Sequence, residues 1–503
     1  MAITNGPLLN SAPAPQKQAL TTNYLDLSST SGWGQQYIPD LMEKEAEVFG
    51  PRTISGFLSQ VGAEESMTAD QVIWSEQSRL HLSYKCYVSG AATGTTAGTG
   101  ATSIITIEKD IDGIAIASVG HGVRINDTII VSDATNGIVK CLVTDVSATT
   151  VECLPYDIGA ANLAVTTSEQ TTILVYGSEY GKGMQYRTSV TTPGDTASDS
   201  RGANEPRFKT FSNKPIILRD YYEVSGSDAS RIGWVEVTTE GGQSGYLWYL
   251  KAESETRLRF TDHIEMAMLE AELNDSSSLV DGSIMLGSTT AGTGTAGTEG
   301  LFAAIESRGN LTSGVTGVNA ATDLAEFDAI LAEFDNQGAI EENMMFVNRA
   351  TSLAMDDMLA SMNSYGAGGT SYGVFNNSED MALNLGFSGF RRGSYDFYKS
   401  DMRYLNDKAT RGGINAASTA NAIRGIMVPA GTSTVYDQQL GKNLKRPFLH
   451  VRYRASQTDD RKMKSWVTGS VGAATSALDA MQIHMLSERC LVTQGANNFM
   501  LMK

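Results

Sequence analysis

Apolar and polar positions follow a helical period between Gly245 and Leu273. Residues at three- or four-residue steps are mostly apolar: Leu247, Leu250, Ser254, Leu258, Thr261, Ile264, Met268 and Leu269. Charged residues fill the positions between them, which predicts a solvated far side. At 1.5 Å per residue the helix would be about 43 Å long, more than the width of a small domain. A helix of that length is typical of an extended scaffold.

Short β-branched runs recur at regular spacing upstream of this helix. The runs are Ile104–Ile107, Ile114–Ala117, Val123–Val131, Ile138–Val143, Thr150–Leu154 and Ile173–Tyr176. Turn signals such as Asp112-Gly113 and Asn136-Gly137 separate them. This spacing predicts a small β barrel or sandwich. We interpret it as an insertion, entered through the Gly/Ala/Thr/Ser tract Ser89–Thr102, which is typical of a flexible connection.

The remaining pattern predicts a mixture of helices, strands and long loops. Before the insertion we expect an extended arm over residues 1–37, a helix over Asp40–Phe49 and a strand pair over Val72–Tyr84. After it we expect a long loop over Gly181–Glu205 and strand character over Arg207–Val237. In the second half we expect helices at Leu301–Glu306, Asp323–Phe334, Arg349–Met362 and Ala473–Ala480, and strands at Met344–Val347 and Gln482–Val492.

A length of 503 residues is enough for two to four domains. The 50 Gly and the low share of charged residues, 19%, favour an ordered but loop-rich protein. The net charge of −18 disfavours nonspecific nucleic-acid binding by the chain as a whole. The segment Arg391–Lys464 differs, with 15 Lys/Arg against 6 Asp and no Glu, a net of +9. Docking on acidic surfaces of neighbouring chains is the favoured interpretation of this segment. Contact with DNA is the alternative, without a recognisable nucleic-acid-binding motif.

The cysteines, the first residues and the lengths of the apolar runs indicate the cellular compartment of the protein. The four cysteines, Cys86, Cys141, Cys153 and Cys490, form no CxxC pair, which argues against a disulfide framework. The first residues lack a basic stretch followed by an apolar one, so no signal peptide is expected. No apolar run is long enough to span a bilayer. The sequence therefore predicts a soluble protein made in a cytoplasm.

Candidate chemical motifs are incomplete. Gly292–Gly297 has the letters of the dinucleotide fingerprint but lacks the preceding strand and the following acidic residue. Gly177–Gly183 lacks the Ser/Thr and spacing of a phosphate loop, and Asp110–Gly113 is a turn without calcium-ligand positions. His263, beside Asp262 and Glu265, is the histidine best placed for chemistry. A solvated or interface histidine is favoured, because no second helix supplies partner ligands. We therefore expect no catalytic, cofactor-binding or metal-binding residues, no cofactor and no enzyme activity.

Several short motifs resemble, in their order, those of tailed-bacteriophage major capsid proteins. Gly50–Phe57 followed by Val72–Glu76 is similar to the opening that leads into the E-loop, and Asn213–Ile217 with Val224–Gly226 resembles the returning strand. Glu299–Ile305, Phe327-Asp328 and Met344–Asn348 resemble the P-domain and the entry to the A-domain, and Phe387–Leu405 with Leu491–Phe499 resembles A-domain strands and the closing segment. The sequence also looks like the branch found in crAss-like phages. The insertion departs from the minimal family pattern, so its role does not transfer.

The resemblance implies an α+β fold, the phage major-capsid fold, with an inserted small all-β domain. The implied parts are an N-terminal arm over 1–50, the P-domain start and descending E-loop strand over 51–86, the inserted β domain over 87–180, the E-loop return over 181–238, the P-domain with its spine helix over 239–335, and the A-domain with closing P-domain strands over 336–503.

The implied function is self-assembly into hexamers and pentamers of an icosahedral head that encloses double-stranded DNA. The implied partners are further copies of the chain, portal, scaffold and minor or decoration capsid proteins, and packaged DNA in weak nonspecific contact, with no membrane. The implied location is the virion shell, assembled in the bacterial host cytoplasm. A tail-tube or decoration protein is the alternative, which the long helix disfavours because such proteins are mostly β. A hydrolase or binding module is a third hypothesis, for which no set of residues is present.

Overall fold

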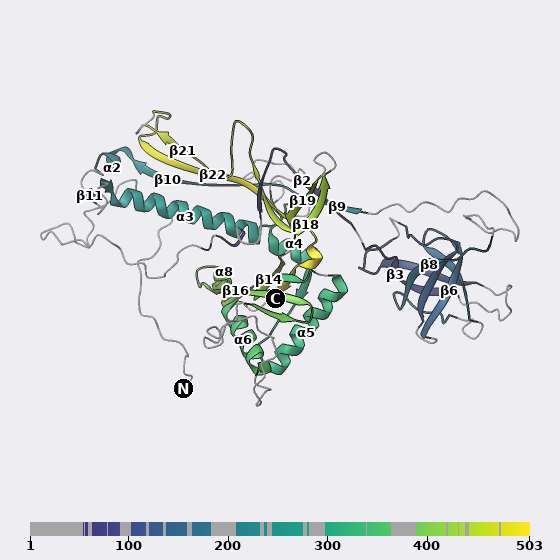
Figure 1. Ribbon diagram of the computed structural model, residues 1–503. Helices are drawn as coiled ribbons and strands as arrows, with labels where there is room; N and C mark the ends of the chain where they lie inside the picture. The colour runs from purple at the N-terminus through teal and green to yellow at the C-terminus, as the bar shows by residue number, and fades with distance from the viewer. Residues whose placement is uncertain are drawn as a thin grey trace. The chain divides into compact units, whose positions relative to one another are not determined.

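The computed structural model describes residues 54, 56–58, 63–77, 79–90, 102–116, 120–133, 137–157, 163–182, 208–231, 236–238, 244–274, 279–280, 297–338, 340–363, 389–418, 421–430, 432–437, 442–471 and 474–503. Over these residues the chain is a mixed α/β protein with several sheets and few helices (Figure 1). It divides into two compact units, one made of Met1–Trp74 with Phe211–Lys503 and the other of Ser75–Thr210.

A five-stranded sheet in the first unit is built around one long strand, β22. Its strands run in the order β1 (Ala63–Met67), β20 (Leu449–Arg454), β22 (Ala480–Thr493) and β10 (Ile216–Ser225), and β21 (Lys464–Gly469) also pairs with β22. β10 and β22 are antiparallel along all ten residues of β10. Helix α3 (Leu247–Glu270) lies along this pair, and its Phe260 and Ile264 pack against Leu218 and Met485 (Figure 1).

A six-stranded sheet is the second large sheet of this unit. Its order is β13 (Asn310–Thr312), β23 (Met500–Met502), β17 (Gly425–Pro429), β14 (Glu342–Val347), β16 (Tyr395–Asp401) and β15 (Gly389–Arg392). Helices α5 (Ala320–Gln337) and α6 (Arg349–Asn363) cover one face, where Met345 and Val347 join their core. The other face contributes Phe346 to a core shared with α3 and with α4 (Leu301–Arg308).

Shorter elements complete the described part of the chain. They are β2 (Val72–Gln77), paired with β9 (Phe208–Asn213); α2 (Gly226–Arg231); β11 (Glu236–Thr238), paired with β12 (Ser244–Tyr246); α8 (Arg403–Asn406); α9 (Arg411–Ala417); β18 (Thr432–Asp437), paired with β19 (Lys442–Pro447); and the 3-10 turn η4 (Ala496–Asn498).

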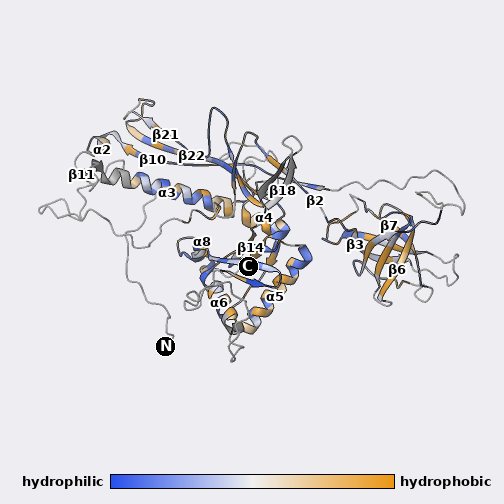
Figure 2. Ribbon diagram, viewed as in Figure 1, coloured by the Kyte–Doolittle hydropathy of each residue, from blue (hydrophilic) through white to orange (hydrophobic). Residues whose placement is uncertain are grey.

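The second unit contains a closed six-stranded barrel. Around it the strands follow the order β3 (Ser83–Gly90), β4 (Ser103–Asp110), β7 (Thr150–Pro155), β6 (Gly137–Val146), β5 (Asp127–Asp133) and β8 (Thr171–Ser178). Alternate residues point inward, so that Ile105, Ile129 and Ile173 are fully buried. Figure 2 shows β6 and β7 largely in the hydrophobic colours. Closure removes the free strand edges that an open sheet of this size would expose.

Most strongly periodic segments have the predicted structure. α4, α5, β14, α6 and β22 confirm five predicted elements of the second half. Four of the β-branched runs lie in β4, β6, β7 and β8. The predicted arm over 1–37 and helix over Asp40–Phe49 lie outside the described residues, as do nearly all of Ser89–Thr102 and most of Gly181–Glu205.

Predictions that depended on local pattern alone were wrong at several places. Residues 114–116 form only an isolated bridge, Lys109 with Ala115, and the strand predicted from Val123 begins at Asp127. β2 pairs with β9, whereas the strand that starts at Ser83 belongs to the barrel, so Val72–Tyr84 is not a strand pair.

The alanine-rich stretch Ala473–Ala480 is not a helix. Over residues 474–479 the chain bends, and β22 starts at Ala480. The Ser470 N–H donates to the carbonyls of Leu478 (3.1 Å) and Ala480 (3.0 Å), which closes the connection between β21 and β22. Long-range strand pairing therefore overrides the local helix propensity of alanine here.

The long helix is confirmed over Leu247–Glu270, and its predicted apolar face is buried at Ile264, Met268 and Leu269 but not at Leu258. Leu258 is 43% exposed, while Phe260 is 1% exposed. Ile264, Met268 and Leu269 of the predicted face are buried, and Thr256 and Phe260, which the prediction omitted, are buried with them. Leu258 lies two residues from Phe260, about 200° around the helix, so it cannot share that face.

Candidate functional site

One face of the β10–β22–β21 sheet carries a row of stacked aromatic rings. Leu218 and Met485 point to α3, so residues at the alternate positions point to the opposite face. There Tyr221, His484 and Trp466 stand directly opposite one another on three strands. The ring centroids of Tyr221 and His484 are 5.9 Å apart, and those of His484 and Trp466 are 5.2 Å apart. Tyr221 is 57% exposed, so the row is open on this face.

Two cations flank the indole of Trp466. The guanidinium carbon of Arg219 and the amine of Lys464 each lie 6.0 Å from its ring centroid, within the range of cation–π attraction. A hollow of about 430 Å³ opens at this point. Its lining is Arg219, Asp459, Arg461, Lys464, Trp466 and Leu486. Three cations against one carboxylate make the hollow locally positive in an acidic protein.

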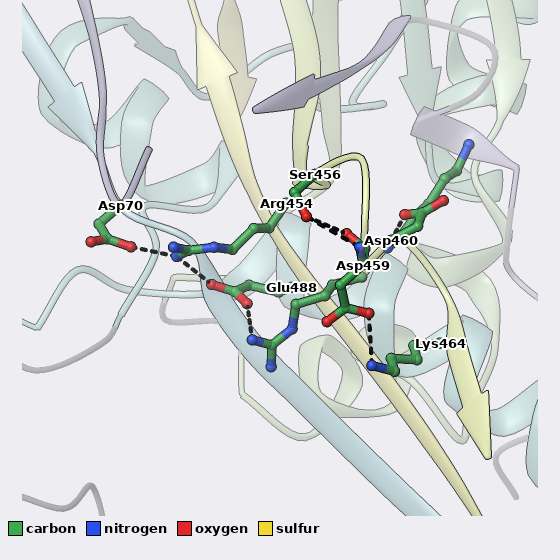
Figure 3. Close-up of polar contacts among 9 residues, drawn as sticks. Asp70, Arg454, Ser456, Asp459, Asp460, Lys464 and Glu488 are labelled. Atoms are coloured by element: carbon green, nitrogen blue, oxygen red, sulfur yellow. Dashed lines mark hydrogen bonds and ion pairs between the residues drawn. The ribbon is translucent and has the colours of Figure 1, made fainter. Parts of the chain in front are cut away.

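Ion pairs hold two of these cations in place (Figure 3). The Lys464 amine lies 2.7 Å from an Asp459 carboxylate oxygen, and Arg461 lies 3.0 Å from Glu488. Glu488, whose side chain is 4% exposed, also pairs at 3.2 Å with Arg454. A buried carboxylate with two guanidinium partners is a strongly coupled arrangement, because loss of the carboxylate would leave two cations without a buried counter-charge.

A second charged group lies on the α3 side of the same sheet. Arg489, mostly buried, donates to the Ser487 hydroxyl (2.9 Å) and the Lys462 carbonyl (2.7 Å), and its guanidinium lies 3.4 Å from Glu64. Burial lowers the pKa of Arg489, and the nearby Glu64 and Glu265 carboxylates oppose that shift. Lys462 also pairs with Glu64. These contacts fasten β1 to β22 and to the connection between β20 and β21.

The basic segment Arg391–Lys464 uses many of its cations inside the folded chain. Pairs with acidic residues from outside the segment are Arg392–Asp328, Lys399–Asp356, Arg411–Glu270, Arg452–Glu65, Arg454–Asp70, Arg461–Glu488 and Lys462–Glu64. Much of the excess of +9 is therefore balanced within one chain. These pairs test neither of the two interpretations of the segment, neighbouring chains or DNA.

His263 is exposed on α3, and the two carboxylates beside it have another role. Asp262 accepts a hydrogen bond from the Ile54 N–H (3.0 Å), and Glu265 accepts one from the Gly56 N–H (2.9 Å). Burial raises the pKa of Glu265. The structure thus does not bring His263 and these carboxylates into one chemical site. Instead, the carboxylates hold the backbone at Ile54 and Gly56 on α3, and the ring of the adjacent Phe57 meets Phe346 edge-on with centroids 4.7 Å apart.

The four cysteines are all buried free thiols: Cys86, Cys141 and Cys153 in the barrel and Cys490 in β22. Burial raises the pKa of the Cys86 and Cys490 thiols to about 12, which suppresses the reactive thiolate. Within the described ranges, no group of three or more His, Cys, Asp or Glu residues is arranged to hold a metal ion.

The glycine motifs rejected from the sequence form no site among the described residues. Gly113 has φ +87° and donates to the Asp110 carbonyl at 2.9 Å, so Asp110–Gly113 is a turn. Gly177 lies in strand β8, and of Gly292–Gly297 only Gly297 is described. None of the helices that the structure describes is both long and apolar enough to cross a membrane.

No model of a known protein family matches the chain, and no curated protein sequence matches it. Among solved structures, the chain is similar to one named "Microbacterium phage Oxtober96", with 9% identity, coverage of 94% of this chain and 98% of that chain, and a TM-score of 0.38. It is similar to "Capsid of empty GTA particle computed with C5 symmetry", with 9% identity, coverage of 95% and 98%, and a TM-score of 0.34. It is also similar to "Capsid structure of the Cyanophage P-SCSP1u", with 9% identity, coverage of 64% and 83%, and a TM-score of 0.31. These similarities are low, and the function proposed below rests on the chain's own residues and elements.

Proposed function

We propose that this chain is the major capsid protein of a tailed double-stranded DNA phage. The observation that supports the proposal best is α3, a 24-residue helix that covers one face of the β10–β22 pair and leaves the other face of β10 exposed. The sequence motifs that resemble capsid proteins fall on the elements around it in chain order, from β2 through β10 and α4 to β14 and β22. In this proposal α3 is the spine helix of the P-domain.

The proposed mechanism is geometric rather than chemical. A helix backed by a thin sheet exposes a long second face, and on β10 that face presents Ile217, Arg219 and Tyr221 to solvent. A contact between two copies through this face would be weak by itself. A closed shell repeats each such contact many times, so the contacts stabilise the shell cooperatively. A net charge of −18 suits a shell that must hold packaged DNA without binding it tightly.

The finer parts of the proposal follow the sequence resemblance. The chain would form hexamers and pentamers of an icosahedral head in the virion, built in the host cytoplasm around double-stranded DNA, with portal, scaffold and decoration proteins as partners. The proposal includes the domain assignments: the arm over 1–50, the E-loop segments 51–86 and 181–238, the inserted domain 87–180, the P-domain 239–335 and the A-domain 336–503. It also includes membership of the crAss-like branch. The protein would act as a structural component and not as an enzyme.

Expression of the full chain together with its neighbouring structural genes tests the proposal. We expect size-exclusion chromatography to separate capsomer-sized and larger species, and negative-stain electron microscopy to show rings or closed shells. Long tubes of uniform width would indicate a tail-tube protein instead. A chain that remains monomeric under all co-expression conditions would overturn the capsid assignment.

A further inference from the structure

Arg219 is the cation of the hollow to which the described residues offer no acidic partner. Lys464 is paired with Asp459, and Arg461 is paired with Glu488. Among the described contacts, the Arg219 guanidinium faces only the Trp466 ring, on an exposed position of β10. A planar guanidinium with free donors next to an aromatic surface is suited to bind a carboxylate in two-pronged geometry. The hollow therefore offers an incomplete ion pair.

The chemistry of the hollow favours carboxylates of a protein over a nucleic-acid backbone. Asp459 is part of the lining, and it would repel a continuous track of phosphates. A protein surface with separate carboxylates carries no such continuous charge, so single carboxylates can pair with Arg219. The stacked row of Trp466, His484 and Tyr221 adds an apolar surface for an aromatic or aliphatic side chain of the same partner.

The barrel of the second unit has the complementary chemistry. Residues 87–180 hold ten acidic residues against Lys109, Arg124 and Lys140, a net of −7. Several of its carboxylates accept hydrogen bonds from neutral donors, which do not offset their charge: Glu108 from Ser168, Glu152 from Thr102, Asp145 from a backbone N–H and Glu179 from Tyr156. Tyr156 and Tyr176 are about half exposed, at 49% and 50%. An acidic surface with exposed tyrosines matches a basic hollow with exposed rings.

We propose that the hollow at Arg219 and Trp466 binds the acidic β barrel of a second copy of this chain. One or more barrel carboxylates would pair with Arg219 and Lys464, and a barrel tyrosine would pack on the ring row. The inference deepens the proposed function, because it names a contact between copies. It requires association of the chains but not a closed shell.

Zero-length cross-linking in an isotopically mixed assembly tests the proposal. Full-length chains labelled with ¹⁵N and unlabelled chains are mixed before association and treated with a carbodiimide, which joins an amine to a carboxylate in direct contact. We expect Lys464 peptides of one isotope joined to carboxylate peptides from residues 87–180 of the other. The Lys464–Asp459 product within one chain serves as an internal positive control. Lys399, whose side chain is 6% exposed and paired with Asp356, should give products of a single isotope only.

A charge reversal gives the matched variant. Arg219→Glu should lower the yield of mixed-isotope Lys464 products about fivefold or more, because it replaces an attraction of up to about 1 kcal/mol by a repulsion. Arg257→Glu makes the same change on α3, where Arg257 is also exposed, and should leave the yield unchanged. Raising the salt from 0.05 to 0.5 M should lower the yield in the unaltered chain, since the Debye length shortens.

Each outcome supports or overturns the inference. Lys464 products confined to Asp459, or mixed products that map outside residues 87–180, overturn it. Loss of mixed products on addition of double-stranded DNA, with Lys464 protected, would indicate a nucleic-acid site instead. Mixed products in soluble oligomers that never form shells support the inference and count against the proposed capsid function. Shells without mixed products would overturn the inference alone.

Discussion

The buried face of α3 gives a sharp test of how this helix is held. Phe260 is 1% exposed and packs with Ile264, Leu218 and Met485, so its ring joins the helix to both long strands. Leu258, two residues away, is 43% exposed. Truncation of a buried phenylalanine to alanine costs about 3–5 kcal/mol through lost burial and the remaining cavity. Truncation of a half-exposed leucine costs about 0.5 kcal/mol, because little apolar surface returns to water.

Paired alanine variants show which face of α3 is buried against the sheet, whereas a proline variant would not. Leu258→Pro would remove a backbone hydrogen bond and clash with the preceding turn, at about 3 kcal/mol or more, on whichever side of the helix it lay. Phe260→Ala and Leu258→Ala keep the backbone intact and differ only in the side chain removed. The proline variant serves as the positive control for loss of the helix.

The assay is thermal unfolding of the unassembled chain, followed by circular dichroism, together with the yield of assembled particles. We expect Phe260→Ala to lower the midpoint by several degrees and to reduce assembly strongly. Leu258→Ala should match the unaltered chain in stability. Equal loss of stability in both variants would refute the reasoning, and so would a larger loss in Leu258→Ala, because either would mean that the sheet does not select the Phe260 face.

Three further changes test the charged and close-packed positions. Glu488→Ala should lower the free energy of unfolding by about 1–3 kcal/mol, because Arg461 and Arg454 lose a buried partner but are themselves partly exposed, and Arg454 keeps its pair with Asp70. Asp459→Ala, at an exposed pair, should cost under about 1 kcal/mol. Gly300→Ala should cost about 1–3 kcal/mol, since its Cβ would lie 2.7 Å from a backbone nitrogen, while Gly389→Ala meets only ordinary contacts and should be tolerated in the same melts. Burial raises the pKa of Glu265, so the folded state binds a proton more tightly than the unfolded chain, and stability should fall as pH rises above the ordinary glutamate range. Glu265→Gln should remove that fall, and an unchanged pH profile of stability in this variant would exclude Glu265 as its source.

Local periodicity was sufficient to predict a helix or strand where one side of the element is buried along most of its length. α5 repeats Phe327, Ile330 and Phe334 at helical spacing, and each is fully or almost fully buried. In the barrel, residues such as Ile105 and Val139 follow the two-residue alternation of a strand with one buried face. These patterns are strong because burial of one face decides both the sequence and the structure.

Pairing between distant segments was beyond the reach of sequence pattern. Tyr221 lies opposite His484, and Trp466 lies opposite the same histidine, so the ring row depends on the register of three strands from both halves of the chain. The sequence over 216–222, Ile-Ile-Leu-Arg-Asp-Tyr-Tyr, predicted a strand but did not alternate between apolar and polar residues in a way that marks the exposed face. It did not indicate which residues would complete that face.

Charge shows most clearly why a candidate surface needs the structure. A count along the sequence makes Arg391–Lys464 the basic part of the chain, yet seven of its cations pair with acidic residues brought to them from other segments. Arg219 lies outside that segment and adds nothing to its count, but no acidic residue in the described part of the chain pairs with it beside the aromatic row. The charge available to another molecule is what remains after folding has paired the rest. A basic segment therefore overstates the positive surface it contributes, which is why we place the proposed contact with a second chain at a single exposed arginine outside that segment.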